Sequence, residues 1–215
     1  MPPIHPYRIL ALGDSYTVGE GVALNENFPA QLTARLRLQG LESAEPQIVA
    51  QTGWTTGELL AMLDQLSQNL YSGYPYHLVT LLAGVNNQYR GGDLEEYQWQ
   101  FDELLDRART FAGDIPQRVI VLSIPDWGAT PFASGRERAK IALEIDTFNA
   151  VNRGLAEAAG VNYVDVTAIS RRAGFESGLL AADGLHPSAQ MYATWVDVLY
   201  QPVLSVLTFR SKDEA

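Results

Sequence analysis

Five short runs of valine, isoleucine and leucine alternate along this chain with longer segments in which apolar residues recur at helical spacing. Apolar runs of this length without polar alternation are typical of strands that are buried on both faces, as in a parallel sheet. Strands that alternate with helices predict right-handed crossovers, with helices covering both faces of the sheet. The predicted strands are residues 7–12, 47–51, 77–83, 118–123 and 161–165.

The segments between the strands carry the predicted helices. In the fourth of them, Ile141, Ile145 and Phe148 recur at helical spacing and define the buried face. Gly160 follows as the residue whose left-handed conformation ends this helix. Ser188 suits the N-cap of the last helix, and Pro202 is expected to kink that helix or end its regular part. The predicted helices are residues 28–38, 56–69, 94–111, 136–159 and 188–207.

The order of these elements predicts an α/β protein, a three-layer α/β/α sandwich around a five-stranded parallel sheet. With 47% apolar and 19% charged residues, the chain of 215 residues can build a sizeable core and is too apolar for disorder. No repeat, low-complexity segment or linker interrupts it. We therefore expect one domain over residues 1–215, ordered from about residue 5 to 208 and ending in a short polar tail.

Charge and composition exclude several kinds of partner and chemistry. The 15 basic and 25 acidic residues give a net charge of −10 without any basic run, which argues against binding nucleic acid or anionic membranes. No apolar run approaches the roughly 18 residues that span a bilayer, so we expect no integral membrane association. The absence of cysteine excludes disulfides, iron–sulfur clusters and a cysteine nucleophile. The N-terminus shows no signal peptide, which favours a cytoplasmic location, or a periplasmic or secreted one if a signal was removed.

Chemically useful residues follow several of the predicted strands, at the edge where open α/β sheets bind ligands. The first strand runs into Gly-Asp-Ser at 13–15, the second toward Gly53, and the third into Gly-Val-Asn at 84–86. Before the last helix, His186 follows Asp183 by three residues. That spacing lets the carboxylate hold one ring nitrogen while the other nitrogen acts as a base. The edge therefore offers a hydroxyl nucleophile, two amide donors and a paired imidazole.

Taken singly, each of these residues has an ordinary structural explanation. Ser15 could cap the following helix, and Gly53 could supply a positive φ at a turn. Asn86 could equally be a turn residue, and a lone histidine is usually structural. The combination is what indicates a site, because only three histidines occur in the chain and one of them, His186, lies at the predicted active edge with its carboxylate.

Other chemistries lack their motifs in this sequence. The phosphate-binding Gly-x-x-x-x-Gly-Lys-Ser/Thr pattern and the dinucleotide-binding Gly-x-Gly-x-x-Gly pattern are both missing. No pair of histidines has metal-ligand spacing, so we expect no metal site. Residues 13–17 read Gly-Asp-Ser-Tyr-Thr, which does not match the Gly-x-Ser-x-Gly elbow of α/β-hydrolases. A nucleophile after the first strand indicates a different arrangement.

The four segments together resemble the four sequence blocks of the SGNH hydrolase superfamily, also called GDSL-type esterases and lipases. Gly-Asp-Ser at 13–15 resembles the nucleophile block, Gly53 the second, Gly-Val-Asn at 84–86 the third, and Asp-Gly-Leu-His-Pro at 183–187 the last. The blocks extend over nearly the whole chain and occur in the family's order. The resemblance implies a flavodoxin-like strand order, 2-1-3-4-5.

The resemblance also implies roles for individual residues. Ser15 would be the nucleophile, His186 the general base and acid, and Asp183 the carboxylate that orients it. The backbone N–H groups of Ser15 and Gly53 would form the oxyanion hole with the side-chain amide of Asn86. In a 2-1-3 order, Ser15 lies between Gly53 on one side and Asn86 on the other, so a carbonyl attacked by Ser15 can receive both donors. The sequence departs from the family directly after Asn86, where Asn87 stands in place of a common aspartate.

These observations predict a serine esterase that forms an acyl-enzyme on Ser15, acts on short-chain or small soluble esters and needs no metal or organic cofactor. The first alternative is a carbohydrate O-acetyl esterase or acetyltransferase with the same triad, which product analysis with added sugar would distinguish. The second is a non-catalytic flavodoxin-like binding module, which would neither hydrolyse esters nor react with a fluorophosphonate. The candidate substrate-binding residues are Trp54, Tyr89, Trp127 and Phe132.

Overall fold

The computed structural model describes residues 6–71 and 74–208 of the chain. It contains a five-stranded parallel sheet with the order β2-β1-β3-β4-β5, which confirms the predicted order 2-1-3-4-5. Every observed strand end lies within two residues of its predicted position. The expected polar tail after residue 208 lies outside the described residues. The strands are β1 (Ile9–Gly13), β2 (Gln47–Ala50), β3 (Leu78–Leu82), β4 (Val119–Leu122) and β5 (Asn162–Val164).

The central strands are buried along their whole length, as their continuous apolar runs predict. Every residue of β1, β3 and β4 is buried, whereas the outer strands β2 and β5 are partly exposed. At the carboxyl end of β1, Gly13 pairs with Ala50 of β2 on one side and Leu82 of β3 on the other. The segments that follow these three strands therefore start from one point at the edge of the sheet.

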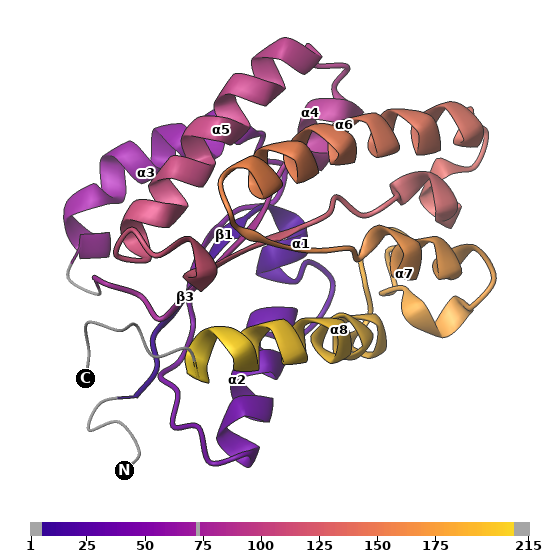
Figure 1. Ribbon diagram of the computed structural model, residues 1–215. Coiled ribbons are helices and arrows are strands. Elements are labelled where there is room, and N and C mark those ends of the chain that lie inside the picture. Colours follow the sequence, from indigo (N-terminus) through magenta and orange to yellow (C-terminus); the bar gives the residue numbers. More distant parts are fainter. Residues whose placement is uncertain (1–5, 72–73, 209–215) are drawn as a thin grey trace.

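Helices cover both faces of the sheet and complete the predicted α/β/α sandwich (Figure 1). On one face, α3 packs against α5, and α5 packs against α6. On the other face, α2 packs against α8. Within the described residues, no helix is both long and apolar enough to span a membrane. The long helices are α2 (Phe28–Leu38), α3 (Thr56–Tyr71), α5 (Leu94–Phe111), α6 (Arg138–Ala158) and α8 (Ala189–Thr208).

The ends of the long helices mostly follow the local signals in the sequence. Gly160 has φ +68° just after α6, and the N–H of Met191 donates to Ser188 Oγ at 3.3 Å at the start of α8, as predicted. Of the two outcomes expected at Pro202, termination does not occur, because α8 continues to Thr208. Apolar side chains on both sides of this proline are buried in the core and hold the helix in place.

Three short helices escaped the sequence analysis, namely α1 (Ser15–Val18), α4 (Val85–Tyr89) and α7 (Thr167–Arg171). Each has only four or five residues, which is too short for an apolar period to appear. Two of them matter for the site, because α1 begins at Ser15 and α4 carries Asn86.

Candidate active site

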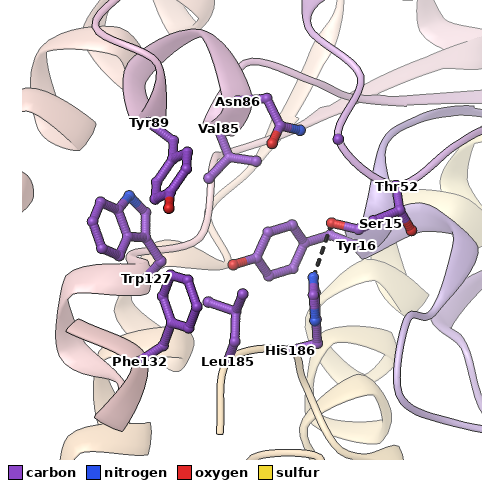
Figure 2. Close-up of a pocket in the computed structure, with 11 residues that line it drawn as sticks. Ser15, Tyr16, Thr52, Val85, Asn86, Tyr89, Trp127, Phe132, Leu185 and His186 are labelled. Atoms are coloured by element: carbon purple, nitrogen blue, oxygen red, sulfur yellow. Dashed lines mark hydrogen bonds between the residues drawn. The ribbon is translucent and has the colours of Figure 1, made fainter. Parts of the chain in front are cut away.

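A cavity of about 170 Å³ lies at the carboxyl ends of β1, β2 and β3. The predicted residues Ser15, Gly53, Asn86 and His186 all line it, although they come from four separate segments of the chain. Figure 2 shows Ser15 and His186 on one side of this cavity and a group of aromatic side chains on the other. The strand order thus produces the juxtaposition that the sequence predicted.

The hydroxyl of Ser15 and the imidazole of His186 are in direct contact. Nε2 of His186 lies 3.0 Å from Ser15 Oγ, and Nδ1 of the same ring lies 2.6 Å from Asp183 Oδ2. Ser15 and His186 are buried, whereas Asp183 is partly exposed at the rim of the cavity. His77, in contrast, lies at the amino end of β3, where its Nδ1 accepts the N–H of Arg8 at 3.1 Å. Only His186 of these two reaches the site; His5 lies outside the described residues.

The Asp-Gly-Leu-His segment forms a tight turn that presents the carboxylate to the imidazole. Oδ1 of Asp183 accepts the backbone N–H groups of Leu185 at 2.9 Å and His186 at 3.0 Å, which leaves Oδ2 for the ring. Gly184 has φ +68°, a conformation that favours glycine at this turn. A second glycine, Gly21 with φ +83°, lies beside this turn, and a Cβ added to it would come within 2.9 Å of Ala181 Cβ.

The carboxyl of Asp183 is held in its ionised form. Its partial burial disfavours the charge, but hydrogen bonds from the His186 ring and from two backbone N–H groups outweigh this and lower its pKa below the usual value. The charge is therefore present at neutral pH, and Nδ1 of His186 carries its proton toward Asp183. Nε2 is then left as an acceptor for the Ser15 hydroxyl.

The candidate oxyanion donors surround Ser15 from both sides. Gly53 has φ +88°, and among the described residues its N–H has no hydrogen-bond acceptor. The Asn86 amide donates one N–H to the carbonyl of Trp54 at 2.8 Å, which fixes its orientation and leaves a second N–H available. The exposed side chain of Arg90 stabilises the loop that contains Gly53, because its Nη2 donates to the Gly53 carbonyl at 2.5 Å.

Asn87, which stands in place of the family's common aspartate, points away from the cavity. Its Oδ1 accepts the N–H of Thr56 at 3.0 Å, and its Nδ2 donates to the hydroxyl of the same threonine at 2.8 Å. This neutral side chain therefore ties α4 to the first turn of α3. An amide can provide both the donor and the acceptor here, which an ionised carboxylate could not.

The structure places three of the four predicted substrate-binding residues in the cavity wall. Tyr89, Trp127 and Phe132 line the cavity, but Trp54 does not. The side chain of Trp54 packs against the hydrophobic core, and its carbonyl accepts from Asn86 instead. Neighbouring positions after a strand can point in opposite directions, so sequence position alone could not separate Gly53 from Trp54.

Tyr16 is a lining residue that the sequence analysis missed. Its ring is buried beside His186, with the ring centroids 5.4 Å apart, and its hydroxyl points toward the aromatic side of the cavity (Figure 2). Burial, followed by the charge of Asp14, raises the pKa of this phenol, so the hydroxyl stays protonated as a hydrogen-bond donor. The signal in the sequence that could have identified Tyr16 is its position directly after Ser15. Thr52, Val85 and Leu185 were missed as well.

Asp14 is a buried carboxyl next to the candidate nucleophile. Its side chain caps α1 by accepting the N–H of Tyr16 at 3.0 Å on Oδ1, while Oδ2 has no hydrogen-bond partner among the described residues. Burial raises its pKa to about 7, from a normal value of 3.8, against the opposing effect of the Tyr16 hydrogen bond. The N-cap, which was the alternative explanation for Ser15, is therefore provided by Asp14, and the Ser15 hydroxyl contacts His186 instead.

Asp14→Asn is expected to stabilise the protein more at pH 8 than at pH 4.5. Between about pH 4 and 7 the folded wild type keeps a proton on Asp14 that the unfolded chain has lost, so its free energy of unfolding falls as the pH rises. Asparagine keeps the cap and does not titrate. The difference in melting temperature between variant and wild type should grow across this range and level off above pH 7. The exposed Asp102→Asn is the control, and an equal difference at all pH values would contradict the prediction.

The fold is an α/β/α sandwich, and its candidate site brings a serine hydroxyl, an imidazole and a carboxylate together at one edge of the sheet. The sequence pattern of the GDSL-like lipase/acylhydrolase family matches residues 11–194, and the chain belongs to this family. It is accordingly a carboxylic ester hydrolase. None of the curated proteins compared with this chain matches it.

Solved structures with a similar fold include several hydrolases. The lipase Lip_vut3 from a goat rumen metagenome is 24% identical, with a TM-score of 0.72 over 91% of this chain and 97% of that one. The psychrotrophic esterase EstA from Pseudoalteromonas sp. is 19% identical, with a TM-score of 0.67 over 94% and 99%. An acetyl xylan esterase, AlAXEase, is 17% identical, with a TM-score of 0.69 over 90% and 98%.

Proposed function

We propose that this protein hydrolyses short-chain or small soluble carboxylic esters through an acyl-enzyme on Ser15. The observation that carries the proposal is the unbroken chain of contacts from Asp183 through His186 to Ser15, at 2.6 and 3.0 Å. A serine hydroxyl is a weak nucleophile, and an adjacent base held by a third group is the arrangement that activates it. Ser15 and His186 line the cavity, which provides space for the ester.

The reaction divides into two steps of the same kind. As Ser15 Oγ attacks the ester carbonyl carbon, Nε2 of His186 takes the hydroxyl proton, and the carbonyl oxygen becomes an oxyanion. The intermediate collapses when the alcohol oxygen leaves with that proton, and the acyl group stays on Ser15. A water molecule then attacks the acyl-enzyme with His186 again as the base, which releases the acid and restores the serine. The ionised Asp183 stabilises the imidazolium that forms in both steps.

The oxyanion would receive hydrogen bonds from the N–H groups of Ser15 and Gly53 and from the Asn86 amide. The N–H of Ser15 belongs to the first turn of α1, where no intrahelical acceptor is available. The three donors line one cavity and are held before the substrate arrives, so they need no reorganisation as charge develops.

A fluorophosphonate is the direct test of this function. Mass spectrometry should show one adduct, on Ser15, and the labelled protein should no longer hydrolyse p-nitrophenyl acetate. One of the similar structures, EstA, is described as inhibited by monoethylphosphonate. An adduct on another residue, or ester hydrolysis that persists after complete labelling, would refute the assignment. Addition of a sugar acceptor distinguishes the alternative, because an acetyltransferase would yield acetylated sugar.

Asn86→Ala is expected to lower kcat by about 10²–10³-fold with little change in KM. The oxygen that this amide contacts carries its charge mainly in the transition state, so loss of the donor affects kcat. An oxyanion donor in a characterised serine hydrolase has an effect of this size. Steady-state kinetics on p-nitrophenyl acetate measure both constants.

Asn87→Ala is the matched control for this prediction. Because this side chain binds Thr56 and not the cavity, its loss should lower the melting temperature and change kcat much less. A loss confined to KM in Asn86→Ala would make that residue a ground-state binding group. If the two variants exchanged their effects, Asn87 would be the donor.

A further inference from the structure

Three aromatic side chains form one side of the cavity, and we refer to Tyr89, Trp127 and Phe132 as the aromatic wall. Tyr89 ends α4, whereas the other two come from the segment between β4 and α6. The ring centroids are 5.1 Å apart for Tyr89 and Trp127, 6.1 Å for Trp127 and Phe132, and 6.3 Å for Tyr89 and Phe132. All three pairs lie in the range of favourable ring contacts, so the wall is one cluster.

The aromatic wall leaves ring surface uncovered. Trp127 is 5% exposed and forms the back of the wall, while Tyr89 and Phe132 are each 45% exposed. In Figure 2 the three rings lie on the side of the cavity opposite Ser15 and His186, with the Tyr16 side chain between the two groups in this view. Apolar side chains of Val85 and Leu185 also line the space. Adjacent aromatic side chains left half-exposed beside a reactive group are available to bind an apolar ligand.

Hydrogen bonds hold the back of the wall in place before any ligand binds. Trp127 Nε1 donates to Gln88 Oε1 at 2.7 Å, and Gln88 Nε2 donates to Glu144 Oε2 at 2.7 Å. The buried indole N–H is therefore satisfied, and the ring orientation is fixed from α4 and α6. A fixed ring loses little conformational freedom when a ligand packs against it.

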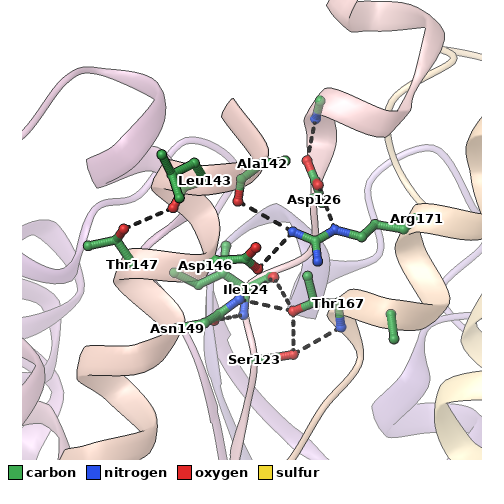
Figure 3. A network of polar contacts seen from close by, with 12 residues as sticks. Ser123, Ile124, Asp126, Ala142, Leu143, Asp146, Thr147, Asn149, Thr167 and Arg171 are labelled. Carbon is green, nitrogen blue, oxygen red and sulfur yellow. Dashed lines mark hydrogen bonds and ion pairs between the residues drawn. The ribbon is translucent and has the colours of Figure 1, made fainter. Parts of the chain in front are cut away.

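A second set of contacts fixes the segment that carries Trp127 and Phe132. Asp126 is buried, and its Oδ2 accepts Nε of Arg171 at 2.8 Å while its Oδ1 accepts the N–H of Gly128 at 2.9 Å. The same guanidinium donates to Asp146 on α6 at 2.7 Å (Figure 3). These contacts join the segment to α6 and α7, so the aromatic wall rests on a rigid support.

The size of the cavity restricts what the aromatic wall can bind. Its volume of about 170 Å³ is close to that of an engineered apolar cavity of about 150 Å³ that binds benzene. The cavity therefore has the size of about one six-membered ring, and a long acyl chain could not be enclosed in it. An aromatic ring gains ring-to-ring contacts here in addition to the burial that a saturated ring of the same size would gain.

We infer that the preferred substrates are esters bearing a single aromatic ring, which packs against Tyr89, Trp127 and Phe132 while the ester carbonyl lies at Ser15. This inference rests on the proposed function and specifies its substrate class. The ring can belong to the acyl group or to the alcohol, and the test includes both.

Two matched pairs of esters test the inference. Methyl phenylacetate and methyl cyclohexylacetate differ only in the acyl ring, and benzyl acetate and cyclohexylmethyl acetate differ only in the alcohol ring. With hydrolysis followed in a pH-stat, kcat/KM should be at least about fivefold higher for the aromatic member of one pair or both, equivalent to about 1 kcal/mol. Equal values in both pairs, or a preference for the saturated rings, would overturn the inference.

A variant pair ties the preference to the aromatic wall. Phe132→Leu keeps an apolar side chain but removes the ring, so the ratio of aromatic to saturated ester should fall by half or more. Phe175→Leu is the control, because this residue is 95% exposed and does not line the cavity, and its ratio should equal that of the wild type. An unchanged ratio in Phe132→Leu would also overturn the inference.

The same measurements, together with hydrolysis of ethyl acetate and labelling of Ser15, distinguish failure of this inference from failure of the proposed function. If ethyl acetate is hydrolysed and Ser15 takes the fluorophosphonate, but neither pair shows a preference, only the substrate class is wrong. If ethyl acetate is not hydrolysed and Ser15 is not labelled, the proposed function itself fails.

Discussion

Ser15→Ala is expected to lower kcat for p-nitrophenyl acetate by about 10⁶-fold while the protein remains folded. The variant keeps the backbone N–H groups and the cavity but has no oxygen for Nε2 of His186, 3.0 Å away, to activate. Removal of the nucleophile from another serine hydrolase has an effect of this size. Without the hydroxyl no acyl-enzyme forms, so no burst of nitrophenol should precede the steady state in this variant.

Ser205→Ala provides the control for this prediction. Its hydroxyl lies on the exposed side of α8 and donates to the carbonyl of Gln201, remote from the cavity. Its kcat should equal that of the wild type. Circular dichroism and the melting temperature would show that both variants are folded. A Ser15→Ala protein with more than a few per cent of wild-type activity would mean that another group carries the acyl chain.

Asp183→Asn is expected to lower kcat by about 10⁴-fold, an effect second only to that of Ser15→Ala among the variants predicted here. The amide oxygen can still accept the N–H groups of Leu185 and His186, so the turn is kept. The amide then presents an N–H to Nδ1 of the imidazole, which makes Nδ1 an acceptor and moves the ring proton to Nε2. The ring cannot accept the proton of Ser15 in that tautomer, and the corresponding substitution in another serine hydrolase has an effect of this size.

Two measurements separate loss of the base from loss of structure in this variant. Crystallography should show a preserved turn, and ¹⁵N NMR of the imidazole should show the proton on Nε2 in place of Nδ1. Asp197→Asn, which changes an exposed carboxylate on α8, should have no comparable effect on kcat. A loss below tenfold with the altered tautomer would show that His186 is not the base.

Much of the fold could be predicted from the sequence because its signals are local. A continuous apolar run identifies a buried strand wherever it occurs, and the apolar period of α2 and α5 predicted both helices with their observed ends. The capping residues Ser188 and Gly160 act within a few residues of themselves. At Pro202 the local signal did not decide, because burial of the surrounding helix in the core has a larger effect than one missing hydrogen bond.

The candidate site was predictable to the extent that it follows from strand ends. Ser15, Gly53 and Asn86 each come directly after or close to a strand, and the order of the strands places them around one point. The pairing of Asp183 with His186 is also local, because a three-residue spacing lets one carboxylate bind both the ring and the backbone. These residues could be named from local sequence, whereas the strand order that brings them together was implied only by the family resemblance.

By itself, then, the sequence determined the sheet, the long helices and the residue types that meet at one edge of it. Only the tertiary structure decided which side chains enter the cavity. Asn86 and Asn87 are adjacent in sequence, yet one lines the cavity and the other binds α3. The burial of Asp14 and the aromatic wall likewise depend on segments that are far apart in the chain. Orientation and burial follow from packing between such segments, and no local pattern of residues encodes that packing.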